Sequence, residues 1–322
     1  MSADEIVNDL LHKAMQDVVT DIYFIPKSDF YIIQARNQSS RQVISQLNSD
    51  MAQSLMNVLK FRGGLDIAEK RRPQKGSFVF ESDTANVSIR ISSIGDYKNR
   101  ESLVIRLIYN SAVVDTSIDQ IVKDLLLSAK KPGMMVFSGP MGSGKTTLMY
   151  RIARELSGQK MVMCIEDPIE IEEPEFIQLQ VNEQAQMTYE ELIKASLRHR
   201  AEVLIIGEIR DKETAKVALQ AAMCGYTVLT TIHSKSKFSV IKRMVQLGID
   251  PDEIVNGVNL ISYQRLIPTI SKSEIFIDSI SNSKIIEFLE NSKRDDNWKL
   301  QLKESLNKGV ITKDIYEEYI SG

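Results

Sequence analysis

Hydrophobic residues in the first part of the chain recur at two different spacings. Between Ile6 and Val18 they return at helical intervals, which predicts an amphipathic helix close to the start of the chain. The segments "TDIYFIP" and "DFYIIQAR" are instead rich in β-branched and aromatic residues, so they predict two strands that a Pro-Lys-Ser turn separates. A second helix is predicted over residues 49–62, because Gly63 and Gly64 interrupt the pattern there.

Three further strands are predicted by "GSFVFESD", "ANVSIRISSIGD" and "ESLVIRLIYN", in which polar and apolar residues alternate. In the second segment the apolar side chains share one face and Arg90 points to the other, and Arg106 does the same in the third. We therefore expect residues 1–110 to form an α+β domain in which two neighbouring antiparallel strands each carry an arginine on the polar face. Residues 111–117 are expected to be a linker.

The pattern changes from Met134 onward, where short apolar runs alternate with helical segments. The runs "MMVF", "MVMCI", "VLII" and "TVLTTI" each lead into polar residues, namely Gly139, Glu166, Glu208 and His233. Continuous runs of this kind are typical of a parallel sheet with helices on both faces. Because ligands bind outside the carboxyl ends of the strands in such sheets, we expect the four endings to converge on one crevice.

This alternation predicts an α/β domain over residues 118–270. Beyond Pro268 the chain becomes polar. Residues 271–322 are therefore predicted to be a mostly helical tail that begins with a short strand pair.

One sequence motif indicates which kind of ligand the predicted sheet binds. The segment "GPMGSGKTTLMY" has the spacing G-x-x-x-x-G-K-[ST] and lies between an apolar run and a helical pattern. Its glycines let backbone N–H groups wrap around phosphates, Lys145 reaches the outer phosphates, and Thr146 offers a hydroxyl to Mg²⁺. We therefore expect a nucleotide with Mg²⁺. The expected binding residues are Gly139, Gly142, Ser143, Gly144, Lys145, Thr146 and Thr147.

The other strand endings each allow a functional and a plain structural interpretation. Glu208 ends the buried run of "VLIIGEIRD", where proteins with this loop place a group that orients the attacking water, although a solvated glutamate after a strand is common. Glu166 and Asp167 in "CIEDPIE" either hold the waters of a metal ion or belong to a charged loop. His233, taken alone, is more often structural than chemical at such a position.

Composition and charge limit the classes of partner that we expect for this protein. The net charge is −3 and the pI is near 5.8, so the chain offers no broad cationic surface and direct nucleic-acid binding is not expected. The basic run "EKRRPQK", residues 69–75, is either a solvated face or a contact across a subunit interface. Cys164 and Cys224 are too few for a disulfide framework, and their apolar neighbours predict reduced thiols in the core.

The start of the chain, "MSADEIVNDLL", is acidic and lacks the pattern of a signal peptide. No window reaches ~18 consecutive apolar residues, the length that a membrane-spanning helix needs. We therefore expect the protein in the cytoplasm, or on the cytoplasmic face of the membrane through a partner.

Several segments in a fixed order resemble one known family. The segments "GPMGSGKTTLMY", "IEDPIE", "SLRHRAEVLIIGEIRDKETAKVALQAAMCGYTVLTTIHS" and "YQRL" are similar to the Walker A, Asp-box, Walker B, His-box and closing motifs of the type II secretion and type IV pilus traffic ATPases. The resemblance implies a RecA-like ATPase domain after a smaller PAS-like N-terminal domain, with ATP as the nucleotide. It also implies a homohexamer at the cytoplasmic face of the cell membrane, beneath a polytopic membrane protein.

The resemblance implies a role for each matching residue in the ATPase domain. Lys145 and Thr146 would hold ATP and Mg²⁺. Glu166 would assist at the metal, and Glu208 would position or activate the attacking water.

The remaining matches include two departures from the family pattern. His233 matches the His-box histidine, and Arg90 and Arg106 match a pair of arginines that reach the γ-phosphate. Tyr23 and Tyr226 stand where the family has histidines. A role shared by two histidines in the His box would therefore fall on His233 alone.

Within the family, "TDIYFIP", "RRPQKG", "SLRHR" and "DDNWKLQL" are most similar to the branch that assembles a competence pseudopilus, and the tetracysteine zinc module of longer members has no counterpart. The sequence therefore predicts an ATP-hydrolysing motor that powers assembly of a pseudopilus for DNA uptake. Three alternatives stay open: a type IV pilus retraction ATPase, a nucleotide-gated adaptor or switch without mechanical cycling, and a RecA-class DNA motor.

Overall fold

The computed structural model describes residues 2–37, 41–82, 86–109, 116–270 and 273–320. The chain divides into two compact units, Met1–Val113 and Val114–Gly322. Most of the predicted linker, residues 111–117, lies outside the described residues. Helix α3 begins near its end, at Thr116.

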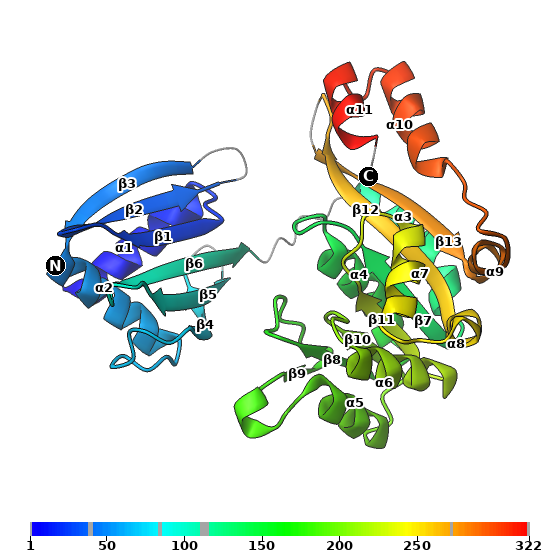
Figure 1. The fold of residues 1–322 in the computed structure, drawn as a ribbon, viewed down its shortest axis with the longest axis horizontal. Coiled ribbons are helices and arrows are strands. Elements are labelled where there is room, and N and C mark those ends of the chain that lie inside the picture. Colours follow the sequence, from blue (N-terminus) through cyan, green and yellow to red (C-terminus); the bar gives the residue numbers. More distant parts are fainter. Residues whose placement is uncertain (1, 38–40, 83–85, 110–115, 271–272, 321–322) are drawn as a thin grey trace. The chain divides into compact units, whose positions relative to one another are not determined.

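The N-terminal unit is a six-stranded antiparallel sheet with the order β3-β2-β1-β6-β5-β4 and two helices (Figure 1). Its elements are α1 (Ala3–Gln16), β1 (Asp21–Pro26), β2 (Phe30–Arg36), β3 (Arg41–Asn48), α2 (Ser49–Arg62), β4 (Gln74–Glu81), β5 (Asn86–Gly95) and β6 (Glu101–Tyr109). The predicted α+β architecture is confirmed. The sequence pattern does not reveal β3, because this edge strand exposes side chains on both faces and so lacks an apolar alternation.

Both helices of this unit pack on one face of the sheet. A capping box fixes the start of α1, since the Ser2 hydroxyl accepts from the Glu5 N–H at 3.2 Å and the Glu5 carboxylate accepts from the Ser2 N–H at 2.7 Å. Leu11 of α1 is fully buried against α2 and the inward residues of the strands. The other face of the sheet carries Arg90 on β5 and Arg106 on β6, which lie directly opposite each other in the register.

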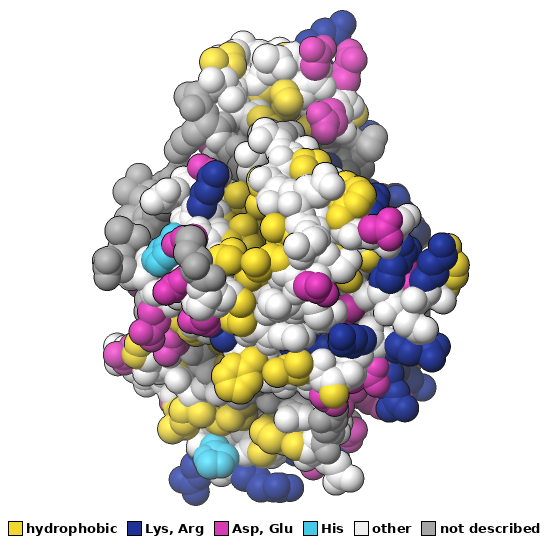
Figure 2. All heavy atoms as spheres, turned by 90° about the vertical axis from the view of Figure 1, so that its left-hand side faces the viewer, with side chains coloured by type: hydrophobic (Ala, Val, Ile, Leu, Met, Phe, Trp, Pro, Cys, Tyr) yellow, Lys and Arg dark blue, Asp and Glu magenta, His cyan; other side chains and the backbone are white. Residues whose placement is uncertain are grey.

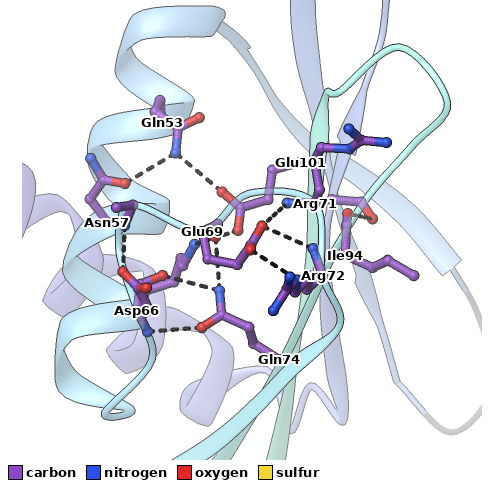
Figure 3. Close-up of polar contacts among 12 residues, drawn as sticks. Gln53, Asn57, Asp66, Glu69, Arg71, Arg72, Gln74, Ile94 and Glu101 are labelled. Atoms are coloured by element: carbon purple, nitrogen blue, oxygen red, sulfur yellow. Dashed lines mark hydrogen bonds and ion pairs between the residues drawn. The ribbon is translucent and has the colours of Figure 1, made fainter.

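A buried ion pair and the Gln74 side chain hold the loop that follows α2, and Figure 3 shows the contacts of Gln74 with Glu69 and Asp66. Lys60 is fully buried, and its Nζ atom lies 2.6 Å from Oε1 of Glu101 and 2.6 Å from the carbonyl oxygen of Glu69. The Gln74 side chain closes the same loop, because it donates to the Glu69 carbonyl oxygen at 2.8 Å and accepts from the Asp66 N–H at 2.8 Å. The basic run "EKRRPQK" is therefore hydrogen-bonded at Glu69 and Gln74, and its arginine side chains are exposed.

Charged side chains of both signs lie on the surface. Figure 2 shows Lys, Arg, Asp and Glu side chains on one face of the molecule, with hydrophobic side chains among them. The net charge of −3 is the small difference between 40 Lys and Arg residues and 43 Asp and Glu residues.

The C-terminal unit is built on a seven-stranded sheet with the order β13-β12-β7-β11-β10-β8-β9 (Figure 1). The strands are β7 (Gly133–Ser138), β8 (Val162–Glu166), β9 (Ile177–Gln180), β10 (Val203–Ile206), β11 (Thr227–Thr231), β12 (Val258–Pro268) and β13 (Ser273–Ser281). All neighbours pair in parallel except β12 and β13, which pair antiparallel. The predicted parallel sheet is confirmed.

Helices cover both faces of this sheet, so the central strands are buried throughout and their sequences read as continuous apolar runs. Helices α3 (Thr116–Ala129) and α4 (Lys145–Ser157) pack on one face. The other face is covered by α5 (Tyr189–Arg198), α6 (Lys212–Met223), α7 (Lys237–Gln246), α8 (Pro251–Gly257) and α9 (Asn282–Asn291).

The chain beyond Pro268 packs back onto the unit. Strand β13 pairs along the length of β12, and α10 (Asn297–Asn307) and α11 (Lys313–Tyr319) enclose a small core with Tyr263 and Ile267 of β12. Trp298 stacks edge-on against Tyr263, with 5.2 Å between the ring centroids. Buried Lys237 adds a second link, because its Nζ atom lies 2.6 Å from Asp278 and 2.6 Å from Asp295.

The prediction that both cysteines lie in the core is correct for one of them and wrong for the other. Cys164 on β8 is buried, but Cys224 is exposed, because it follows the last residue of α6 on the surface side of the chain. Among the described residues, no helix has the length and apolar character needed to cross a membrane.

Candidate active site

The predicted convergence of strand endings is confirmed by the sheet order. Strands β7, β11, β10 and β8 are neighbours and run parallel, so their carboxyl ends lie at one edge of the sheet. Backbone hydrogen bonds continue past the strands: Ile232 donates to Phe137 at 3.1 Å, and Gly207 donates to Ile165 at 2.9 Å. A Cβ atom added to Gly207 would lie 3.1 Å from Cγ of Glu166, so the Walker B and Asp-box segments are in direct contact.

The phosphate loop after β7 has the backbone that its glycines predict. Gly139, Gly142 and Gly144 have φ values of +146°, +75° and +83°, a region that side-chain-bearing residues rarely adopt. Helix α4 begins at Lys145 directly after this loop, and Gly144 has no side chain to cap it. The first-turn N–H groups of the helix, including those of Lys145 and Thr146, are therefore suited to an anion.

Lys145 lies folded into this loop. Its side chain is 8% exposed, and Nζ donates to the carbonyl oxygens of Gly139 at 3.0 Å and Pro140 at 2.8 Å. Burial lowers the pKa of Lys145, while the nearby carboxylates of Glu170 and Glu208 act to raise it. Phosphate oxygens would be stronger acceptors for this ammonium group than two neutral carbonyls.

Strand β12 packs against the phosphate loop, a contact that the sequence pattern does not reveal. The side-chain amide of Gln264 donates to the carbonyl oxygen of Ser143 at 2.6 Å. A Cβ atom at Gly139 would lie 2.2 Å from the carbonyl oxygen of Gln264, so only glycine fits there. Ser143 Oγ and Gln264 Oε1 are buried without a hydrogen-bond partner in the part of the chain that the structure describes. The motif "YQRL" contains Gln264, but its spacing gives no sign of this role.

Glu208 lies just beyond β10, with its side chain 20% exposed. Its Oε1 atom pairs with the guanidinium of Arg210, whose pKa this hydrogen bond raises, and its Oε2 atom lies 3.8 Å from Nε2 of His233. Burial raises the pKa of Tyr189, and the carboxylates of Glu208, Asp167 and Glu166 raise it further, so the phenol stays protonated. Arg210 is a contact that the sequence analysis missed, although it stands two positions after Glu208 in "GEIRD".

Glu166 ends β8 and is only 4% exposed. Its Oε2 atom accepts from the hydroxyl of Tyr150 at 3.0 Å and from the Glu170 N–H at 3.4 Å. Burial, together with Cys164 and Glu166, holds the pKa of Tyr150 far above its usual value. The sequence pattern does not reveal this role of Tyr150, because the contact with Glu166 joins a helix to a strand.

The side chains that could bind a metal ion here suit a magnesium ion that is bound together with the phosphates of a nucleotide. Across the described ranges, no cluster of three or more His, Cys, Asp or Glu side chains could hold a metal ion by itself. Thr146, in the first turn of α4, and Glu166, at the end of β8, offer one hydroxyl and one carboxylate. Mg²⁺ is usually bound by one or two such groups, with phosphate oxygens and water completing the octahedron.

Arg90 and Arg106 belong to the N-terminal unit. They share one face of its sheet, and Nε of Arg106 lies 2.8 Å from Oδ1 of Asp21 on β1. The Asp21 carboxylate offsets the charge of Arg106, and both arginines carry planar donor groups of the kind that suit an anion.

Comparison with known proteins places these features in a family. A profile of the family described as "Type II/IV secretion system protein" matches residues 2–298. The chain is 41% identical over 263 residues to the "Competence protein ComGA" of Streptococcus pneumoniae, a match that covers 82% of this chain and 84% of that protein. It is 36% identical over 273 residues to the protein of the same name from Bacillus subtilis, covering 83% and 76%.

The fold is similar to that of a solved structure, the Legionella pneumophila ATPase DotB. The TM-score is 0.76 at 19% identity, and the match covers 100% of this chain and 96% of that one. This likeness confirms the predicted RecA-like fold with its preceding smaller domain.

We expect Gln264→Ala to weaken ATP binding about tenfold, because a buried hydrogen bond that holds the Ser143 carbonyl oxygen is lost. The measurement is a titration with a fluorescent ATP analogue. Gln301→Ala is the matched control, since the Gln301 amide also donates to a backbone oxygen, that of Ile277, but lies on α10. Equal affinities for the Gln264 variant and the control would contradict the assigned role.

Proposed function

Because the chain belongs to the Type II/IV secretion system protein family, we propose that it is an ATP-hydrolysing motor that powers assembly of a competence pseudopilus, a type IV pilus-like fibre for DNA uptake. The observation that carries the proposal is the 41% identity to a competence protein over 82% of the chain. The glycine conformations of the phosphate loop support nucleotide binding.

Phosphoryl transfer depends mainly on positioning and on electrostatic stabilisation, and the site offers both. Lys145 would exchange the carbonyl oxygens of Gly139 and Pro140 for outer phosphate oxygens. Thr146, and Glu166 through water, would hold Mg²⁺, which supplies neutralisation of the phosphate charge.

Glu208 is the group that would orient water for attack on the γ-phosphorus and accept its proton. Arg210 holds the Oε1 atom, which leaves Oε2 on the side of His233. As the new P–O bond forms, the bond from the γ-phosphorus to the bridging oxygen breaks, and ADP carries away the negative charge. The proposed role of His233 is to keep Oε2 directed at the water.

Arg90 and Arg106 would stabilise the charge that develops on the transferred phosphoryl group. Their direct opposition on β5 and β6 presents two planar donor groups on one face, a geometry suited to several phosphate oxygens at once. Both arginines lie in the N-terminal unit, so the proposal gives that unit a part in turnover.

The proposed assembly is a homohexameric ring on the cytoplasmic face of the cell membrane. Its proposed partner is a polytopic membrane protein, through which each hydrolysis cycle would insert pilin subunits into the fibre.

We expect Glu208→Gln to bind Mg-ATP and to hydrolyse it roughly 10²–10⁴ times more slowly, the usual effect of removing a catalytic base. Lys145→Ala is expected to lose both binding and turnover. Phosphate release and fluorescent-nucleotide binding measure the two steps. Glu190→Gln is the control, because Glu190 pairs with Lys194 on the surface of α5. Wild-type turnover by Glu208→Gln would refute the assigned role of Glu208.

Arg90→Ala and Arg106→Ala are expected to lower kcat by roughly 10³-fold or more, as the loss of a transition-state arginine does, with ATP affinity changed only a few-fold. The measurement is steady-state ATPase kinetics. Arg62→Ala is the matched control, since Arg62 forms an ion pair with Asp4. Turnover by the two variants at the rate of the control would remove the arginines from the mechanism.

Light scattering of Glu208→Gln is expected to give six times the 36.4 kDa mass of the chain with Mg-ATP, and a smaller or weaker assembly without it. Lys145→Ala, treated in the same way, should not respond to ATP. A monomer under both conditions, at concentrations well above those expected for assembly, would favour the nucleotide-gated switch over the ring motor.

A further inference from the structure

Tyr150 lies at the centre of a buried polar cluster next to the candidate site. The residue is fully buried in α4, and its hydroxyl oxygen lies 3.0 Å from Oε2 of Glu166 and 3.2 Å from Sγ of Cys164. The side-chain amide of Gln178, on β9, donates to the same hydroxyl at 3.0 Å. Four side chains from one helix and two strands therefore meet at one oxygen atom.

The chemistry of the four groups fixes the direction of the hydrogen bonds. The amide nitrogen of Gln178 can only donate, and the Glu166 carboxylate can only accept. A phenol carries one proton, so the Tyr150 hydroxyl gives that proton to Glu166 and accepts from Gln178. The neutral thiol of Cys164 is left as a weak donor.

Packing alone does not explain a hydroxyl at this position. The Tyr150 ring already fills the core between α4 and the sheet and packs against Phe176, with 5.7 Å between the ring centroids. A phenylalanine would make the same apolar contacts without burying a polar atom, which is unfavourable unless the atom is hydrogen-bonded. The hydroxyl therefore has its physical justification in its hydrogen bonds with Glu166 and Gln178, of which only the bond to Glu166 reaches the candidate site.

The position of Tyr150 along α4 adds a connection to the phosphate loop. Lys145 opens α4, and Tyr150 stands five residues later on the same rigid helix. Glu166 is on β8, so the hydroxyl joins the helix that begins at the phosphate loop to the strand end that carries the carboxylate.

We propose that Tyr150 is the positioning residue for Glu166: its hydroxyl fixes one carboxylate oxygen and keeps the side chain oriented for the waters of Mg²⁺. This inference rests on the proposed function of the site as an ATPase centre. It concerns the geometry of Glu166 and not the binding of the phosphates, so the two are separable by experiment.

Tyr150→Phe in the full chain removes the hydroxyl and keeps the ring. We expect kcat to fall about tenfold or more, since a hydrogen bond to a charged group is lost, while the KM for ATP at saturating Mg²⁺ stays within about twofold. The Mg²⁺ concentration needed for half-maximal binding of a fluorescent ATP analogue should rise by a similar factor. Binding of the same analogue without Mg²⁺ should be unchanged.

Two further variants separate this role from a structural one. Tyr109→Phe removes a hydroxyl whose one proton lies between the carbonyl oxygens of Ala14 and Val19, at 3.0 Å and 2.7 Å from the hydroxyl oxygen, so it lowers stability without reaching the site. Cys164→Ala removes the weak thiol donor of the same cluster, which also contacts Glu166, but leaves the Tyr150–Glu166 bond. Both are expected to keep the wild-type dependence on Mg²⁺, with circular dichroism used to verify that every variant is folded.

Wild-type Mg²⁺ dependence and kcat for Tyr150→Phe would overturn the proposal. So would equal losses in Tyr150→Phe and Cys164→Ala, because a general disturbance of the cluster would then explain both. If the wild-type protein binds Mg-ATP but does not hydrolyse it, the proposed function fails, and the Mg²⁺ dependence of nucleotide binding still decides the role of Tyr150.

Discussion

The close contact between the phosphate loop and β12 is the constraint on which the rest of the site depends. The backbone of Gln264 leaves no room for a side chain at Gly139, and its amide holds the carbonyl oxygen of Ser143. Tyr263, the preceding residue, faces the other side of the strand, where it meets Trp298 of the C-terminal helices. One strand therefore supports the loop on one face and anchors the end of the chain on the other.

The two carboxylates at the strand endings are held in different ways, which suits their different proposed tasks. Glu208 is partly exposed and pairs with the guanidinium of Arg210, so it remains open to water. Glu166 is buried and accepts hydrogen bonds from two neutral donors, the phenol of Tyr150 and the Glu170 N–H. A neutral donor orients a carboxylate without cancelling its charge, which leaves that charge available to a cation.

Much of the fold is readable from local sequence because the local patterns have local causes. The central strands of the ATPase domain are buried on both faces, so each appears as an apolar run, and the glycines of the phosphate loop mark a backbone that only they adopt freely. The sequence pattern does not reveal the edge strands β3 and β9, because one or both of their faces are exposed. The pattern does not reveal strand β12 either, because the buried polar residues Ser262 and Gln264 interrupt its apolar run.

The sequence by itself determined the α/β class, the phosphate loop and the strand endings with Glu166, Glu208 and His233, because all of these depend on neighbours along the chain. Only the tertiary structure decided which side chains support them. The Gln264 amide meets Ser143 across 121 positions and Tyr150 meets Glu166 across 16, and no spacing rule covers such pairs. Exposure of Cys224 was decided in the same way, since burial depends on what packs against a residue and not on its sequence neighbours.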